Sequence, residues 1–333
     1  MAGLPAAVAE WPAEEVEVAA SRRRLRVQRA LGVLWILDAL LQLEPANFSR
    51  ALVNDTILGN VENQPAPIAG SIRLVARLLE AHFVALNVAI VLVQLALGLA
   101  LLAGTWVKPA LACSVLWALG VWWFGEGFGG ILAGEASLLV GAPGAAALYA
   151  LVALAVWPVP CCGARSAAGV GLLGERALLG IWGLLWAGGA LLRVIPFWFA
   201  PVYALQADLQ NGLDGEPRWI FHANETLRHA ALGAGLPLVI AMAALEASVG
   251  IGVLRLEHRR VALLLGGLLA ALYWAIGQQY GGLLTSGATD AGSGPLYLLL
   301  AALLWPLSGR ASSGDARDDH RLPRRREAAA FGL

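Results

Sequence analysis

Ionisable side chains that interrupt long apolar segments are the residues of this chain most able to do chemistry. Asp38 lies about halfway along the apolar range 29–45, and Arg193 lies toward the end of the range 176–198. A charged side chain at the centre of a bilayer costs about 2.5–3.5 kcal/mol on insertion scales, so each needs a partner or a purpose. If the two segments face each other, we expect an Asp38–Arg193 pair, either as a helix-locking ion pair or as an anchor for a polar headgroup or an anion.

A second pair of polar residues lies in the apolar ranges 80–104 and 229–254. Gln94 interrupts the first range and Glu246 the second, and the two residues are 152 positions apart. An acid in an apolar setting holds its proton more tightly and is able to relay protons. The alternative is a protonated Glu246 that is hydrogen-bonded to Gln94 and holds two helices together. The sequence leaves both interpretations open.

Glu126 and Gln278 occupy matching positions in two glycine-rich, aromatic stretches, "WWFGEGFGG" (residues 122–130) and "WAIGQQYGG" (residues 274–282). Glycine permits unusual backbone angles and the close approach of other segments. We therefore expect a structured turn that caps or leads into the next helix, with a substrate-contacting loop as the alternative. The first stretch lacks the strand–loop–helix context of a nucleotide-binding loop.

Metal and catalytic signatures are weak or missing. His222, Glu225 and His229 have a spacing that places them on one face of a helix, which makes them weak candidates for zinc or copper, but the spacing matches no recognised metal motif. We therefore expect no metal site and name no catalytic residue. The chain has no Walker, HExxH, CxxC or CxxCH motif and no Rossmann fingerprint, which argues against nucleotide hydrolysis, covalent haem and nucleic-acid binding.

The elements that must position these residues are membrane-spanning helices. The chain is 59% hydrophobic and 14% charged, with a mean hydropathy of +0.68. Runs such as "FVALNVAIVLVQLALGLALLAG" exceed the roughly 18 apolar residues that span a bilayer. The eight expected spans are 29–45, 80–104, 107–128, 143–160, 176–198, 229–254, 260–280 and 294–307.

The chain also repeats itself at an offset of about 152 residues, which indicates duplication. Each copy holds four spans, an even number, so both copies share one orientation. The predicted fold is therefore an all-α membrane protein of eight transmembrane helices, arranged as two tandem four-helix bundles around a pseudo-twofold axis along the membrane normal. Matching pairs include Trp35 and Trp186, Gly98 and Gly250, Trp122 and Trp274, and Pro143 and Pro295.

Basic residues predict the orientation of the spans. Of the 23 basic residues, 17 fall on the side of the two termini and five on the other side. We expect a multi-pass protein of the bacterial inner membrane, and the positive-inside rule places both of its termini in the cytoplasm. The predicted organisation is a cytosolic tail (1–28), a first repeat (29–160), a cytosolic linker (161–175), a second repeat (176–308) and a second cytosolic tail (309–333).

The order of these segments resembles the DoxX-like four-helix membrane proteins. "RALGVLW" opens the first span and "LALGLALLAGTWVKPALACSV" crosses spans two and three, and the second copy repeats the order with "RALLGIW" and "ASVGIGVLRLEHRRVALLLGG". The chain thus looks like two fused DoxX-like units. It is also similar to uncharacterised actinobacterial integral membrane proteins with a "GEG-GG…GAPG" segment.

The resemblance implies quinone-linked redox chemistry, and no motif here is specific enough to transfer a residue's role. The first functional hypothesis is a membrane protein that binds a quinone or a lipid-like molecule and serves a redox or cell-envelope complex with other membrane proteins. The second is a small-solute or proton-coupled transporter, and the third is a non-catalytic membrane scaffold.

Overall fold

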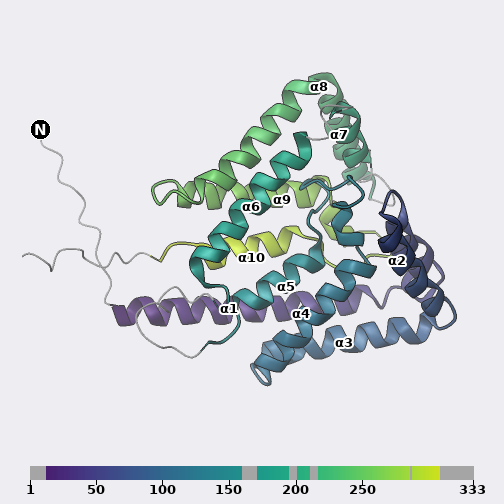
Figure 1. Cartoon of the computed structure of the whole chain (residues 1–333), viewed down its shortest axis with the longest axis horizontal. Coiled ribbons are helices and arrows are strands. Elements are labelled where there is room, and N and C mark those ends of the chain that lie inside the picture. The colour runs from purple at the N-terminus through teal and green to yellow at the C-terminus, as the bar shows by residue number, and fades with distance from the viewer. Residues whose placement is uncertain (1–12, 160–170, 195–200, 211–216, 286, 308–333) are drawn as a thin grey trace, which may run out of the picture.

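A computed structural model describes residues 13–159, 171–194, 201–210, 217–285 and 287–307, and the regular elements within these ranges are helices (Figure 1). The α-helices are α1 (Ala13–Leu41), α2 (Ala66–Glu80), α3 (Phe83–Ala103), α4 (Val107–Phe124), α5 (Ala145–Ala155), α6 (Gly174–Val194), α7 (Pro201–Gln210), α8 (Arg218–Gly252), α9 (Arg259–Ile276) and α10 (Gly294–Leu304). Short helical turns are η1 (Pro45–Phe48), η2 (Leu52–Ile57), η3 (Leu58–Val61), η4 (Gly127–Gly130) and η8 (Gln279–Gly282).

Five helices in the described part of the chain are long and apolar enough to cross a membrane: α3, α4, α6, α8 and α9. A helix overlaps each of the eight ranges expected from the sequence, but α5 and α10 have 11 residues each. At about 1.5 Å per residue such a helix covers roughly half of a hydrocarbon core about 30 Å thick. The expected spans 143–160 and 294–307 are therefore only partly helical, because α5 and α10 both end before these ranges do.

Close helix crossings recur in the two parts of the chain. A Cβ atom on Gly98 of α3 would lie 2.7 Å from the carbonyl oxygen of Gly32 of α1. A Cβ atom on Gly250 of α8 would likewise lie 2.7 Å from the carbonyl oxygen of Gly183 of α6. Small residues at such crossings let helix backbones approach closely, which is how apolar helices gain packing energy when lipid tails surround them. Only glycine fits at these two crossings without a shift of the backbone.

The first half (residues before the segment 161–175) and the second half (residues after it) share one core. Buried side chains from both halves form a single cluster that includes Leu31, Leu148, Trp182 and Leu300. The halves meet chiefly where α10 contacts α5 and α1. The sequence does not indicate through which helices the two halves touch.

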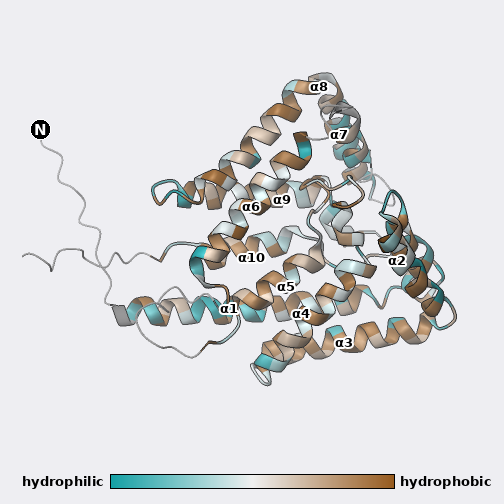
Figure 2. Cartoon of the chain, in the orientation of Figure 1, coloured by the Kyte–Doolittle hydropathy of each residue, from teal (hydrophilic) through white to brown (hydrophobic). Residues whose placement is uncertain are grey.

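Arginines near the start of α1 tie the two short helices together at one end of the molecule. Arg23 donates to the carbonyl oxygen of Trp305 after α10, and Arg24 donates to that of Val156 after α5, at 3.2 Å. Both carbonyl groups lie at a helix C-terminus, where a cation also opposes the helix dipole. Figure 2 shows hydrophilic residues at this end, along the start of α1 and in the turn between α8 and α9.

The loops before the short helices cross between the halves. In the α9–α10 loop (residues 283–293, of which 286 is not described), the backbone N–H of Ala291 donates to Asp38 of α1 at 3.1 Å, and the carbonyl of Ala288 accepts from Asn47 at 3.0 Å. In the α4–α5 loop (residues 131–144), the carbonyl of Ala142 accepts from the hydroxyl of Tyr297 in α10, at 2.9 Å. Each half is therefore completed by a loop of the other.

Candidate ligand site

A cavity of about 370 Å³ lies in the first half between α1, α2, α3, α4 and α5. Figure 1 shows α3 and α4 diverging from the tight turn that joins them, and both helices line the cavity. Most of its wall is apolar, with side chains such as Leu79, Ile90 and Leu116. The α9–α10 loop of the second half completes the lining with Thr289 and Asp290.

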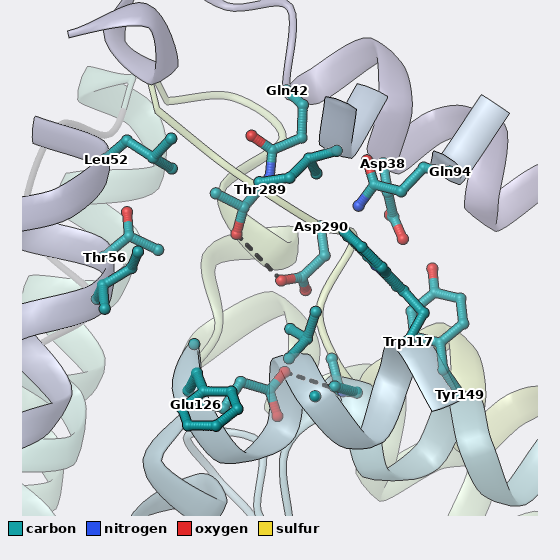
Figure 3. Close-up of a pocket in the computed structure, with 18 of the residues that line it drawn as sticks. Asp38, Gln42, Leu52, Thr56, Gln94, Trp117, Glu126, Tyr149, Thr289 and Asp290 are labelled. Atoms are coloured by element: carbon teal, nitrogen blue, oxygen red, sulfur yellow. Dashed lines mark hydrogen bonds between the residues drawn. The ribbon is translucent and has the colours of Figure 1, made fainter. Parts of the chain in front are cut away.

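Three carboxyl groups line this cavity and come from three different segments (Figure 3). Asp38 comes from the buried face of α1, Glu126 from the turn after α4, and Asp290 from the α9–α10 loop. In Figure 3 the side chain of Asp290 lies between those of Asp38 and Glu126. The arrangement concentrates potential negative charge in an otherwise apolar space.

Backbone groups hold each carboxylate in place. The Oδ1 atom of Asp38 accepts from the N–H of Ala291, and the Oε1 atom of Glu126 accepts from the N–H of Ala146 at 2.9 Å. The Oδ1 atom of Asp290 accepts from the N–H of Gly292 at 2.7 Å, next to a contact of 3.3 Å between its Oδ2 atom and the Thr289 hydroxyl. Beyond these bonds, Oε2 of Glu126 is buried and has no hydrogen-bond partner among the described residues.

Several buried polar atoms of the lining have no hydrogen-bond partner among the described residues. They are Oε1 of Gln42, Oε1 of Gln94, Oε2 of Glu126 and Nε1 of Trp117, whereas the buried hydroxyl of Tyr149 faces the carboxyl group of Asp38. Gln42, Gln94 and Tyr149 are at least nine-tenths buried, whereas Glu126 keeps some exposed surface although its Oε2 atom is buried. A buried polar group without a partner costs about 1–3 kcal/mol. Such atoms around a cavity point to a polar ligand.

The turn that presents Glu126 depends on an unusual backbone. Phe128 and Gly129 both have positive φ, and a Cβ atom on Gly129 would lie 2.1 Å from the carbonyl oxygen of Pro143. The same carbonyl accepts from Nε1 of Trp122 at 2.6 Å, which fixes the α4–α5 loop against the end of α4. The carboxylate of Glu126 then meets the first turn of α5, where free backbone N–H groups favour an acceptor.

The second half builds the same turn with an amide. Tyr280 and Gly281 have positive φ, and Nε1 of Trp274 donates to the carbonyl of Ala291 at 2.8 Å. Gln278 stands where Glu126 stands, and its Oε1 atom accepts from the N–H and the hydroxyl of Ser293, each at 2.9 Å. Gln278 lies in the second half and is not in the lining of the cavity.

This geometry corrects one pairing expected from the sequence. The structural counterpart of Pro143 is Ala291, because the two carbonyl groups make the same bond to equivalent tryptophans, and not Pro295. The offset of 152 residues therefore drops to 148 within the α9–α10 loop.

Arg193 does not pair with Asp38, contrary to the expectation from the sequence. Its Nη2 and Nε atoms donate to Oε1 of Glu246 at 2.7 and 3.0 Å, and the hydroxyl of Tyr273 donates to the same oxygen at 2.8 Å. The two charged residues are buried in the second half. Asp38 faces a different group because the α9–α10 loop packs beside it. The predicted spans do not include this loop, so its position could not be inferred from them.

Gln94 and Glu246 do not meet either, so the expected hydrogen bond between them is wrong. Gln94 lines the cavity of the first half, whereas Glu246 is engaged by Arg193 and Tyr273. The two residues occupy matching positions in the sequence, but each side chain faces the interior of its own half.

The histidine cluster lies on the exposed side of α8. Glu225 pairs with Arg228 at 2.8 Å and with Nε2 of His229 at 2.9 Å. His222 lies one turn earlier on the same helix and is exposed. Within the described ranges no three His, Cys, Asp or Glu side chains come together in a way that could hold a metal ion.

Burial changes the acid–base behaviour of the two carboxyl groups outside the spanning helices. Glu126 lies two residues beyond the end of α4, and burial, followed by the charge of Asp290, raises its pKa to about 8. Burial raises the pKa of Asp290 as well. A neutral or partly protonated cluster at neutral pH follows from this, because several carboxylates cannot all ionise in one apolar space without a cation.

Asp290, Gln42, Trp117 and Tyr149 belong to the cavity but were not among the candidates from the sequence. Asp290 is an acid in a glycine-rich segment just before a short apolar helix, which is the one sequence signal that could have drawn attention to it. Its insertion into the opposite half depends on tertiary structure.

The chain matches no protein-family model, no curated protein and no solved structure.

Proposed function

We propose that this chain is an integral protein of the bacterial cytoplasmic membrane that takes a small lipid-soluble molecule with a hydrogen-bonding head into the cavity of its first half. The observation that supports this proposal is the combination of apolar cavity walls with buried polar atoms that have no hydrogen-bond partner in the described structure. Apolar pockets with a few convergent polar groups are typical of ligand sites.

The membrane arrangement is part of the proposal. Five helices qualify as spans, and we propose that α1, α5 and α10 complete two tandem four-helix units related by a pseudo-twofold axis, with both termini in the cytoplasm. The paired glycine crossings and the paired turns after α4 and α9 support this duplication, because they recur at the offsets found in the sequence.

A quinone is the first ligand to test, since the DoxX-like order of segments implies one. The unpartnered donor Nε1 of Trp117 suits a carbonyl oxygen of such a head group. In this proposal the protein serves a redox or cell-envelope complex through other membrane proteins.

Mass spectrometry of an organic extract tests the proposal. The protein is purified in detergent and its extract is compared with that of bulk membrane lipid, and we expect one lipid-soluble species, such as a quinone, an isoprenoid or a lipophilic amine, enriched to about the protein's own amount. Gly120 of α4 lines the cavity, and a Cβ atom there would meet nothing within 4 Å. A Gly120→Leu variant should lose the species.

Gly180 of α6 provides the matched control for this variant. It is exposed and equally free of neighbours, but it lies outside the cavity lining, so Gly180→Leu should keep the ligand. An extract that contains only bulk lipid in all three proteins would refute the proposal.

Transport is the second candidate, favoured by the short helices α5 and α10 and the non-helical segments that precede them. Irregular backbone at membrane depth is tolerated where it is buried in protein or lines a cavity, and many transporters bind substrate at broken helices. Proton-coupled uptake into liposomes that is lost in Glu126→Gln would support this function. If the Asp38→Asn and Glu126→Gln variants each restore the wild-type phenotype to a strain that lacks the protein, a non-catalytic scaffold role is favoured instead.

A further inference from the structure

The cavity lining carries acidic groups but no basic ones among the described residues. Asp38, Glu126 and Asp290 contribute three carboxyl groups, and no Lys, Arg or His is among the described residues that line the cavity. An ionised carboxylate in an apolar space is strongly disfavoured unless a cation accompanies it. Either the cluster keeps its protons, or a cation from outside the protein joins it.

We infer that the head group taken by this cavity is a monovalent organic cation, such as the ammonium group of a lipophilic amine. The inference rests on the proposed function and specifies its ligand class. It follows from the geometry of the lining: three carboxyl groups from three segments surround a space of about 370 Å³ that also holds unpartnered acceptor atoms.

The second half shows how this fold satisfies a buried acid when it carries its own cation. There Glu246 receives three hydrogen bonds from Arg193 and one from Tyr273. The first half has Gln42 and Gln94 at the positions that match Arg193 and Glu246, so the built-in cation is replaced by a neutral amide. Its acids come instead from α1, from the turn after α4 and from the α9–α10 loop, without a basic partner in the lining.

The unpartnered atoms suit an ammonium group. Oε1 of Gln42, Oε1 of Gln94 and Oε2 of Glu126 are buried acceptors, and an ammonium ion carries up to three N–H donors. Trp35, Trp117 and Tyr149 add aromatic rings to the wall, and a cation near an aromatic face gains about 0.5–2 kcal/mol. The remaining apolar wall, including Leu86 and Ile90, suits a hydrocarbon chain attached to the cation.

Binding of the cation should release a proton. The titratable groups that face Glu126 are Asp38 from α1, Asp290 from the α9–α10 loop and Tyr149 from α5. Because the pKa of Glu126 is raised to about 8, this carboxyl group holds its proton at neutral pH until a cation favours the ionised form. The carboxyl O–H bond breaks, the proton leaves to solvent, and the ammonium group pairs with the carboxylate.

Equilibrium dialysis of the full chain in a neutral detergent tests the inference. The probes are hexylammonium and 1-hexanol, which share an alkyl chain and differ in the charge of the head group, and protein-free micelles correct for partitioning. We expect the cation to bind at least about tenfold tighter than the alcohol, as a charge-assisted contact implies. Affinity for the cation should also fall as the pH drops from 9 to 6.

Two carboxyl variants and a matched control make the test specific. Asp290→Asn and Glu126→Gln should each weaken cation binding about 10- to 100-fold and leave hexanol within about threefold. Glu126→Gln should fold, because Gln278 makes the equivalent bonds in the second half. Glu80→Gln removes an exposed acid at the end of α2, a wall helix, and should bind like the wild type.

The outcomes separate this inference from the proposed function. If hexanol binds as tightly as the cation and Gly120→Leu abolishes both, the ligand site stands and the cation inference is overturned. The inference also fails if both carboxyl variants bind the cation as well as the wild type, or if only a neutral quinone co-purifies and neither probe binds. If nothing binds and nothing co-purifies, both proposals fail.

Discussion

The buried ion pair between Arg193 and Glu246 offers a sharp quantitative prediction. Glu246 is fully buried and Arg193 is 7% exposed, and three donor–acceptor contacts of 2.7 to 3.2 Å join the two side chains. A Glu246→Gln substitution keeps the shape of the side chain but leaves the guanidinium without its counter-charge. The matching positions of the first half hold Gln42 and Gln94, so a double variant Arg193→Gln/Glu246→Gln makes the two halves alike at this depth.

The expected magnitude follows from the cost of an unpaired buried charge. Removing one partner of a buried pair destabilises a protein by about 3–5 kcal/mol, and the loss here should fall toward the lower value. Asp208 of α7 lies within electrostatic range of Arg193 and offers partial compensation. The double variant removes both charges, so it should lose only about 1–2 kcal/mol, well below the roughly 6–10 kcal/mol obtained by adding two single losses.

Unfolding titrations in mixed micelles measure the four proteins of this double-mutant cycle. Tyr273→Phe is the control, since it removes one hydrogen bond to Glu246 without exposing a charge and should cost about 1–3 kcal/mol. A Glu246→Gln protein as stable as the wild type would contradict the ion pair. A double variant whose loss equals the sum of the single losses would show that the two charges do not act on each other.

Three further predictions concern the turn, the helix crossing and the topology. Folded Glu126 keeps a proton that the unfolded chain releases near pH 4.5. The contribution of this proton to the free energy of unfolding should therefore be complete below pH 4.5 and disappear as the pH rises through about 8. Thermal unfolding of Glu126→Gln should not show this decline. Gly98→Leu should destabilise the protein by about 1–3 kcal/mol or more through overpacking against Gly32, whereas Gly120→Leu on the neighbouring helix should not. A periplasm-active reporter fused after residue 333 should be inactive if both termini are cytoplasmic, and an active fusion would overturn that topology.

The helices could be predicted from the sequence because each long apolar run can satisfy its backbone only as a helix in lipid. The expected ranges 80–104 and 107–128 differ from α3 and α4 by a few residues at most. The limits of the short helices were harder to predict, because the range 143–160 is one apolar run although α5 covers only 145–155. Positive φ angles and tight carbonyl contacts before that helix are not visible in hydropathy.

The site could be predicted only in part. Asp38, Gln94 and Glu126 stood out as polar groups in apolar surroundings, and all three line the cavity. Their partners could not be inferred from spacing, because the α9–α10 loop brings Asp290 from about 250 residues away in the chain. Arg193 was a sound candidate for an ion pair, but its partner depended on how α6 packs against α8.

The most direct test of the central claim is an experimental density map of the chain purified with native lipid. We predict non-protein density in the cavity of the first half, with its polar end within hydrogen-bond distance of Glu126 or Asp290 and its apolar part along α3 and α4. The same map of Gly120→Leu should lack it. A cavity that is closed by the protein's own side chains in the wild type would contradict the claim that this half holds a ligand.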